Sequence, residues 1–147
     1  MKDKIFKSLY NNRMLSNHIE IETYEYNLNL LSESFSEEDI IRLCATLEDN
    51  TCDTEVMFSA IHLLESLSSE LAYKNLIIGV VNIYTSSPEW ANIITYRLLN
   101  DDFSVQMIKD LYNRIDKNIG KKFKEILETI KEEDYEQFGK SIDVILS

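Results

Sequence analysis

Turn-forming residues are scarce in this chain, which contains three Gly and one Pro in 147 residues. Sandwiches and barrels need a turn after every short strand, and Gly and Pro supply many of the backbone conformations that those turns require. The chain has 28% charged residues, and it is rich in Leu, Ile, Glu and Lys, which favour helices over strands. We therefore predict an all-α fold.

Helix starts can be located because capping residues precede segments with apolar residues at helical spacing. Ser87-Pro88-Glu89 is the clearest start, since Pro at the first helical position loses only an amide that would be unpaired anyway. Ser36 followed by Asp39 is typical of a capping box. Gly120 lies close to an expected break between helices. The pattern predicts eight or nine short helices, near residues 2–10, 18–34, 36–47, 54–67, 69–84, 88–100, 104–116, 121–131 and 134–146.

The segment 18–34 fits two interpretations. Ile21, Tyr24 and Leu28 recur at helical spacing, but the apolar residues of this segment also alternate as they would in a strand. Seventeen residues without Gly or Pro exceed the usual length of a strand, and no hairpin partner lies nearby. We therefore predict a helix here.

The expected loops are short, so consecutive helices should pack as antiparallel hairpins, either in a HEAT-like stack or in a compact bundle. No self-similarity is visible at a period of about 34 or 40 residues, so any helical repeat must be degenerate. A chain of 147 residues with 44% apolar content suits one well-buried core. We predict a single domain over residues 1–147.

Acidic side chains are concentrated in one block, residues 14–73, which contains thirteen carboxylates and one cation, Arg42. The rest of the chain is nearly balanced, so this block accounts for the net charge of -11. Such a one-sided field can steer a cationic partner. It argues against nucleic acid or an anionic membrane as a ligand, because both are bound through Lys and Arg. No apolar run is long enough to span a membrane, and we expect a cytoplasmic protein.

Signatures of catalysis are missing from the sequence. The two histidines, His18 and His62, lie 44 residues apart, and the HExxH, GxSxG and glycine-rich phosphate motifs are absent. Paired carboxylates occur mostly at predicted helix ends, where they compensate the helix dipole. Cys44 and Cys52 fit no disulfide framework or CxxC motif and should be reduced. We predict a protein that is not an enzyme and that uses no cofactor and no metal ion.

The predicted helix 54–67 has a broad apolar arc for the core, and its opposite face holds Glu55, Phe58, His62 and Glu65. Two interpretations of this opposite face are open. In the first, Phe58 packs under a neighbouring helix and His62 pairs with one of the two acids. In the second, the face is a binding stripe with an aromatic anchor and an acidic rim, as in a hot spot for a basic partner.

Further candidate binding residues lie close to this stripe. Trp90 shares a helix face with apolar residues, so we expect it in the core. Arg97 lies four residues before Asp101, so it could pair with Asp101 or stack on Trp90. The acids of the loop before residue 54 complete the set. The predicted partner-binding residues are Glu48, Asp49, Asp53, Glu55, Phe58, His62, Glu65, Arg97 and Asp101.

Two stretches of the sequence resemble a known family. The first joins DTEVMF at 53–58 to IHLLE at 61–65, and the second joins Trp90 to YRLLND at 96–101. Over about residues 14–112 the chain resembles the immunity protein 30 family of bacterial polymorphic toxin systems. The resemblance implies an all-α protein, encoded beside a toxin gene, that protects the producing cell by binding the C-terminal domain of the toxin. It implies no catalytic residues.

The charge and the resemblance lead separately to a protein that binds a partner, and the resemblance implies that this binder is an immunity protein. Its acidic surface would bind a basic toxin domain and neutralise it through fast, salt-sensitive association. A degenerate helical-repeat scaffold for protein–protein interaction is one alternative, and its groove would be apolar. A DNA-mimic inhibitor is another, and its carboxylates would be spaced like phosphates along a ridge.

Overall fold

The computed structural model describes residues 1–147. The chain forms nine α-helices, one 3-10 helix and no strand, which confirms the predicted all-α fold. The segment that could have been a strand is helical. The elements are α1 (Lys2–Asn11), α2 (His18–Ser32), η1 (Glu37–Asp39), α3 (Ile40–Cys44), α4 (Thr54–Leu64), α5 (Glu70–Ile83), α6 (Pro88–Leu99), α7 (Asp102–Tyr112), α8 (Lys117–Glu133) and α9 (Tyr135–Leu146).

Side-chain caps define most of the helix starts. The side chains of Asn17 and Asp53 each accept a hydrogen bond from the amide three residues later, at the starts of α2 and α4. Each bond satisfies an amide that the first turn of a helix leaves unpaired. The Asp39 carboxylate accepts hydrogen bonds from the amide and the hydroxyl of Ser36, at the predicted capping site. Pro88 is the first residue of α6, as predicted.

Several boundaries differ from the sequence prediction: α4 ends at Leu64, α7 spans Asp102–Tyr112, and two further differences have a local cause. The segment 36–47 begins as a 3-10 turn, and α3 ends at Cys44. Gly120 does not lie at a break, because it is buried inside α8. That helix begins earlier than expected because Asp116 accepts hydrogen bonds from the amides two and three residues later. A side-chain cap at Asp116 therefore outweighs the low helix propensity of one glycine.

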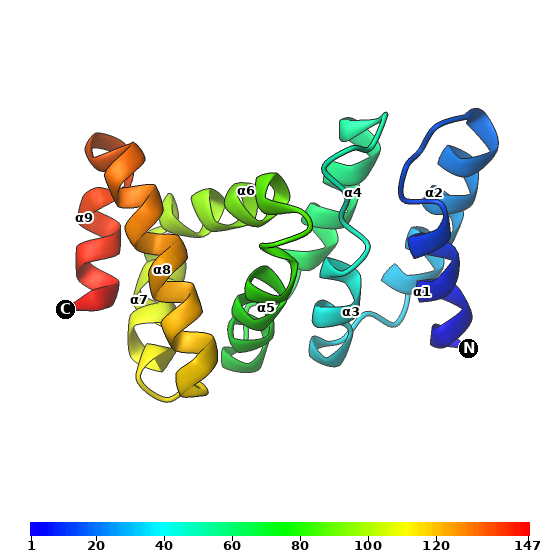
Figure 1. Cartoon of the computed structure of the whole chain (residues 1–147). Helices are drawn as coiled ribbons and strands as arrows, with labels where there is room; N and C mark the ends of the chain where they lie inside the picture. Colours follow the sequence, from blue (N-terminus) through cyan, green and yellow to red (C-terminus); the bar gives the residue numbers. More distant parts are fainter.

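The helices follow one another across the molecule in chain order, from α1 and α2 at one end to α8 and α9 at the other (Figure 1). The helix α5 lies in the middle and contacts α3, α6, α7 and α8, while α1 packs on α2 and α8 packs on α9. In Figure 1, α6 lies across the direction of most other helices. The packing is compact, and a regular HEAT-like repeat stays a prediction.

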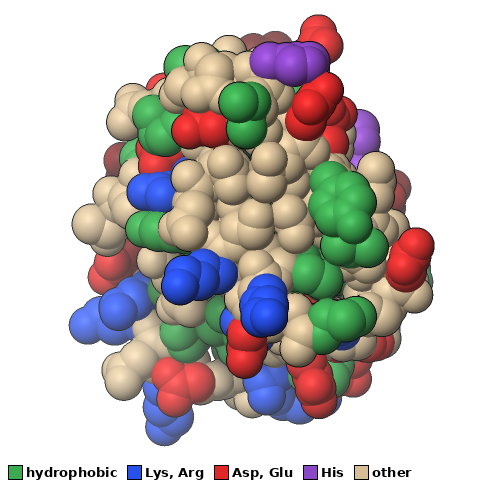
Figure 2. Space-filling view, turned by 90° about the vertical axis from the view of Figure 1, so that its right-hand side faces the viewer, with side chains coloured by type: hydrophobic (Ala, Val, Ile, Leu, Met, Phe, Trp, Pro, Cys, Tyr) green, Lys and Arg blue, Asp and Glu red, His purple; other side chains and the backbone are tan.

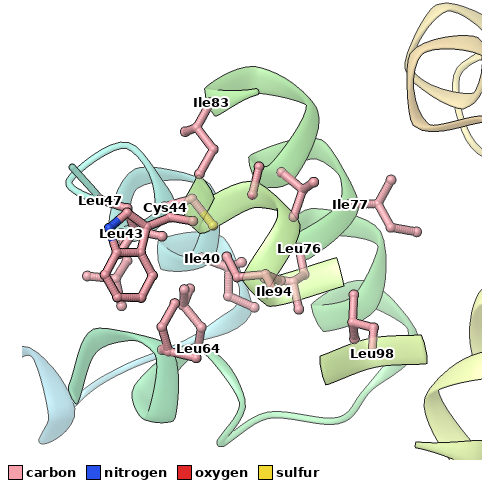
Figure 3. Close-up of a cluster of buried hydrophobic side chains, with 14 of the residues drawn as sticks. Ile40, Leu43, Cys44, Leu47, Leu64, Leu76, Ile77, Ile83, Ile94 and Leu98 are labelled. Carbon is pink, nitrogen blue, oxygen red and sulfur yellow. The ribbon is translucent and has the colours of Figure 1, made fainter. Parts of the chain in front are cut away.

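The core is a single cluster of 38 buried hydrophobic residues to which every α-helix contributes. Figure 3 shows Ile40 and Cys44 of α3, Leu64 of α4, Leu76 of α5 and Ile94 of α6 within this cluster. A continuous core of this kind supports the prediction of one domain over the chain, which stays a prediction.

Candidate functional site

The helix α4 turns its apolar arc inward, as the sequence predicts. Met57, Ala60, Ile61 and Leu64 are buried, and the cap at Asp53 fixes where the helix begins. Because these residues recur every three or four positions, the opposite side of α4 must face outward. That side is where the sequence places a binding stripe.

The outward side of α4 holds Glu55, His62 and Glu65, which are exposed, and Phe58, which is half-buried. The Phe58 ring meets the ring of Trp90 edge to face, with the centroids 5.1 Å apart. Such a contact between aromatic rings is favourable beyond the area that it buries. The packing interpretation therefore holds for Phe58, although its side chain is only half-buried. His62 forms no ion pair with either acid, so this part of the packing interpretation is wrong.

Trp90 is buried, as predicted, and the loop before α4 holds it in place. Its indole N–H donates to the backbone carbonyl of Glu48 at 2.9 Å. The carboxylate of Asp49 accepts hydrogen bonds from the amides of Glu89 and Trp90, at 3.0 and 3.1 Å. Those amides belong to the first turn of α6, so Asp49 caps a helix from a loop 40 residues earlier in the chain.

Capping also accounts for two other acids that the sequence assigns to the binding surface. Asp53 caps α4. Asp101 caps α7 by accepting hydrogen bonds from the amide of Ser104 at 3.0 Å and from its hydroxyl at 2.7 Å. The Ser104 hydroxyl is also hydrogen-bonded to the hydroxyl of Tyr73, at 2.9 Å. Hydrogen bonds therefore link Asp101 through Ser104 to Tyr73, which is buried. Asp49, Asp53 and Asp101 therefore each have a structural role as a helix cap, and their place in a partner-binding surface stays a prediction.

Arg97 of α6 binds the carboxylate of Glu65 through two hydrogen bonds, both 2.7 Å long. These bonds raise the pKa of the Arg97 guanidinium above its ordinary value. The predicted alternatives for Arg97, an ion pair with Asp101 or stacking on Trp90, are both wrong. The reason is that Glu65, at the end of α4, offers a planar two-oxygen partner that suits the forked guanidinium.

A small cavity of about 160 Å³ lies between α4, α5, α6 and α7, with Glu65, Arg97 and Asp101 among its lining residues. Three of the nine predicted site residues are therefore brought together here. Pockets that hold cofactors and drug-sized ligands measure about 300 Å³ or more. The cavity is smaller than this.

Ion pairs also reduce the charge asymmetry that the sequence suggests. Four carboxylates of the block 14–73 pair with cations from outside the block. Arg13 pairs with Glu48 and Arg97 pairs with Glu65. The other two pairs are Lys2 with Asp39 and Arg114 with Glu70. The flanking segments thus neutralise part of the acidic block once the chain is folded.

The sequence interpretation missed the outward face of α2. Ile19 and Tyr26 are 73% and 64% exposed, among the largest values for hydrophobic side chains in the chain. A signal was available, because the alternating apolar residues of this segment cannot all lie on one side of a helix. Tyr24 and Leu28 are buried, and at 100° per residue Tyr26 must point away from both.

Two further observations bear on what these surfaces can hold. No group of three or more His, Cys, Asp or Glu side chains is positioned to hold a metal ion. None of the helices combines the length and the apolar character needed to cross a bilayer.

The fold and surface define a class: an all-α protein of short helices whose exposed acidic and aromatic side chains suit contact with another macromolecule. The model of the family described as immunity protein 30 matches residues 11–108, more than half of the chain. The chain belongs to the immunity protein 30 family, which confirms the resemblance seen in the sequence. Membership implies toxin neutralisation by a protein that binds and is not an enzyme. No curated protein and no solved structure matches the chain.

Proposed function

We propose that this protein neutralises a cognate toxin by binding its C-terminal domain directly, and that an acidic surface of the protein meets a basic surface of the toxin. The family match carries this proposal. The concentration of carboxylates in residues 14–73 supports the sign of the charge. Binding would take place in the cytoplasm of the producing cell, where it would block the toxin before it acts.

The nine predicted site residues would serve such a surface in two ways. Carboxylates that cap helices or pair with Arg keep their negative charge, so Asp49 and Asp53 contribute to the field that steers a cationic partner. Direct contact would fall to side chains with free polar groups, such as Glu55 and His62. Phe58 would offer an apolar edge between them, because its other side is held by Trp90.

Glu65 and Arg97 would form a fixed polar edge to this surface. Their two hydrogen bonds hold both side chains in one geometry, so little side-chain entropy would be lost when a partner contacts them. Nη1 of Arg97 is not used by Glu65, and it could donate to a carbonyl oxygen of the toxin domain.

The test is binding between this protein and the C-terminal domain of the toxin encoded beside its gene. Co-expression should protect cells from that domain and not from an unrelated toxin. The association rate should fall steeply between about 50 mM and 500 mM salt, because the field that accelerates encounter is screened. Binding that is indifferent to salt would favour the scaffold alternative, and absence of both protection and binding would contradict the proposed function.

A further inference from the structure

The outward face of α2 carries two exposed hydrophobic side chains. Ile19 is 73% exposed and Tyr26 is 64% exposed. They are seven residues apart, which is two helical turns, so they lie on the same side of α2. Single exposed hydrophobic residues are common on protein surfaces. A large aliphatic and a large aromatic side chain aligned on one helix face form an apolar strip that a partner can cover.

Acidic side chains without a Lys or Arg partner surround this strip. Glu22, Glu25 and Glu33 are exposed, and none of them forms an ion pair with a Lys or Arg side chain. Glu22 forms its one ion pair with His18, at 2.7 Å. Many of the acids elsewhere in the block cap helices or pair with Arg or Lys, as Asp49 and Glu65 do. The helix α2 is therefore the part of the acidic block with the most carboxylates free of a cation.

The position of α2 leaves this face open. The helix packs on α1 and α4 through its buried residues, and it lies with α1 at one end of the molecule (Figure 1). Figure 2 looks onto that end. Lys and Arg side chains lie mainly in the lower half of the view, whereas the upper part shows hydrophobic, histidine and acidic side chains. Asp and Glu side chains lie in both parts of this end face, so the upper part differs from the lower part mainly in having few cations.

We infer that the outward face of α2, formed by Ile19, Glu22, Glu25, Tyr26 and Glu33, is the principal docking surface for the toxin domain. This inference rests on the proposed function and places the main contact on α2, while Glu55, Phe58 and His62 of α4, the helix that α2 packs on, would add to it. The occupant is a cationic surface of the toxin in which Lys or Arg side chains border an apolar depression. Charge complementarity selects this occupant, because an acidic partner would leave three carboxylates facing like charge.

The two kinds of side chain have different tasks on this surface. Tyr26 supplies a rigid anchor whose ring can be buried while its hydroxyl keeps a hydrogen bond at the edge. Ile19 extends the apolar contact by two turns. The glutamates form a rim that stays hydrated, where they speed association and fix orientation more than they add affinity. The apolar strip should therefore govern the dissociation rate and the acids should govern the association rate.

A matched pair of charge variants tests the role of the rim. Two double variants change the net charge by the same amount. The first combines Glu25→Lys with Glu33→Lys, and the second combines Glu125→Lys with Glu132→Lys on the distant helix α8. In each pair one site is inside a helix and the other is at a helix C-terminal end. The double variant on α2 should associate about tenfold more slowly than the wild type with the toxin domain encoded by the neighbouring gene, at low salt. The double variant on α8 should associate about twofold more slowly or less.

A matched pair of truncations tests the anchor. Tyr26→Ala should accelerate dissociation about tenfold or more. Phe103→Ala removes an aromatic side chain that is 57% exposed on α7, and it should leave dissociation unchanged. Circular dichroism and thermal unfolding would show that all variants remain folded.

The inference requires both results. Equal slowing by the two charge pairs, or dissociation that Tyr26→Ala leaves unchanged, would overturn it while binding by the unmodified protein still supports the proposed function. A failure of the unmodified protein to bind would count against the proposed function itself.

Discussion

The carboxylate of Asp49 accepts hydrogen bonds from the backbone amides of Glu89 and Trp90, at 3.0 and 3.1 Å. These bonds cap α6 across 40 residues of sequence and hold the start of α6 against the loop that precedes α4. The adjacent Glu48 carbonyl accepts the indole N–H of Trp90 at 2.9 Å. One short loop therefore positions both the helix and its buried aromatic residue.

Asp49→Ala should lower the free energy of unfolding by about 1 to 2 kcal/mol, because two amides of the first turn lose a charged acceptor. Chemical denaturation followed by Trp90 fluorescence would measure the change. Asp110→Ala is the matched control, since the Asp110 side chain is exposed, lies inside α7 and makes no hydrogen bond. Equal stability of the two variants would mean that the Asp49 cap is not formed in solution.

The ion pair between Glu65 and Arg97 should contribute little to stability despite its geometry. Both side chains are more than a third exposed, and exposed pairs are screened by water, so we expect a coupling energy of about 0.5 to 1 kcal/mol. A double-mutant cycle with Glu65→Gln and Arg97→Gln would measure it. The same cycle at Glu70 and Arg114, which are more exposed and joined by one hydrogen bond, should give a smaller value.

The helices could be predicted from the sequence because their signals are local. Capping residues and apolar spacing at Asp53 and Pro88 depend only on neighbouring residues, and the structure confirms both starts. The break expected at Gly120 does not occur, because the cap at Asp116 starts α8 before this glycine. The helix in the segment 36–47 ends at Cys44, earlier than predicted, since turns and caps rather than apolar spacing decide where a helix stops.

The candidate site was harder to predict because its contacts join residues far apart in sequence. Nothing local indicates that Asp49 caps α6, or that Arg97 prefers Glu65 over Asp101. A count of charges along the chain cannot show which acids meet cations from other segments. The exposure of Tyr26 could have been deduced, since a helix cannot bury residues that alternate like those of a strand.

The two thiols should react at very different rates. Cys52 is exposed and Cys44 is fully buried. Burial raises the pKa of the Cys44 thiol to about 12, which leaves almost no reactive thiolate at pH 8. One thiol per chain should therefore react quickly with a maleimide or an aromatic disulfide in the folded protein, and two should react in denaturant. Cys52→Ser should abolish the fast reaction; two rapidly reacting thiols in the folded wild-type protein would contradict the packing around α3.

Stability should decline at alkaline pH, because burial of an ionisable side chain favours its protonated form in the folded protein. In the unfolded chain Cys44 ionises near its ordinary pKa of 9.0, whereas the folded protein keeps the proton until about pH 12. Tyr24 behaves in the same way between pH 10 and about 12, because burial outweighs its hydrogen bond to Thr46. Both groups bind protons more tightly when folded, so the stability present below pH 9 is lost as the pH rises.

Between those pKa values each group should lower the free energy of unfolding by about 1.4 kcal/mol per pH unit. Comparing unfolding at pH 8 and pH 10.5 for the wild type and for Cys44→Ala would isolate the thiol. The variant is less stable at pH 8, but it should lose less stability on going to pH 10.5. Identical losses would show that the thiol is not buried.

Gly79 and Gly120 should respond in opposite ways to the same substitution. A Cβ atom at Gly79 would lie 2.5 Å from Sγ and 2.9 Å from Cβ of Cys44, closer than atoms can approach, so α3 and α5 would have to separate. A Cβ atom at Gly120 would meet only Ile115, at 3.7 Å, which is ordinary contact. Both glycines lie inside helices, where Ala gains about 0.5 to 1 kcal/mol over Gly when nothing obstructs it.

Gly120→Ala should therefore be neutral or stabilising, while Gly79→Ala should cost about 1 to 3 kcal/mol. Cys44→Ala removes the obstructing sulfur, so the cost of Gly79→Ala should shrink in the Cys44→Ala background. Chemical denaturation of the four variants would give the coupling energy between the two positions. A Gly79→Ala variant as stable as Gly120→Ala would mean that α3 and α5 do not approach as closely as this contact requires, and the packing of α5 at the centre of the core would need revision.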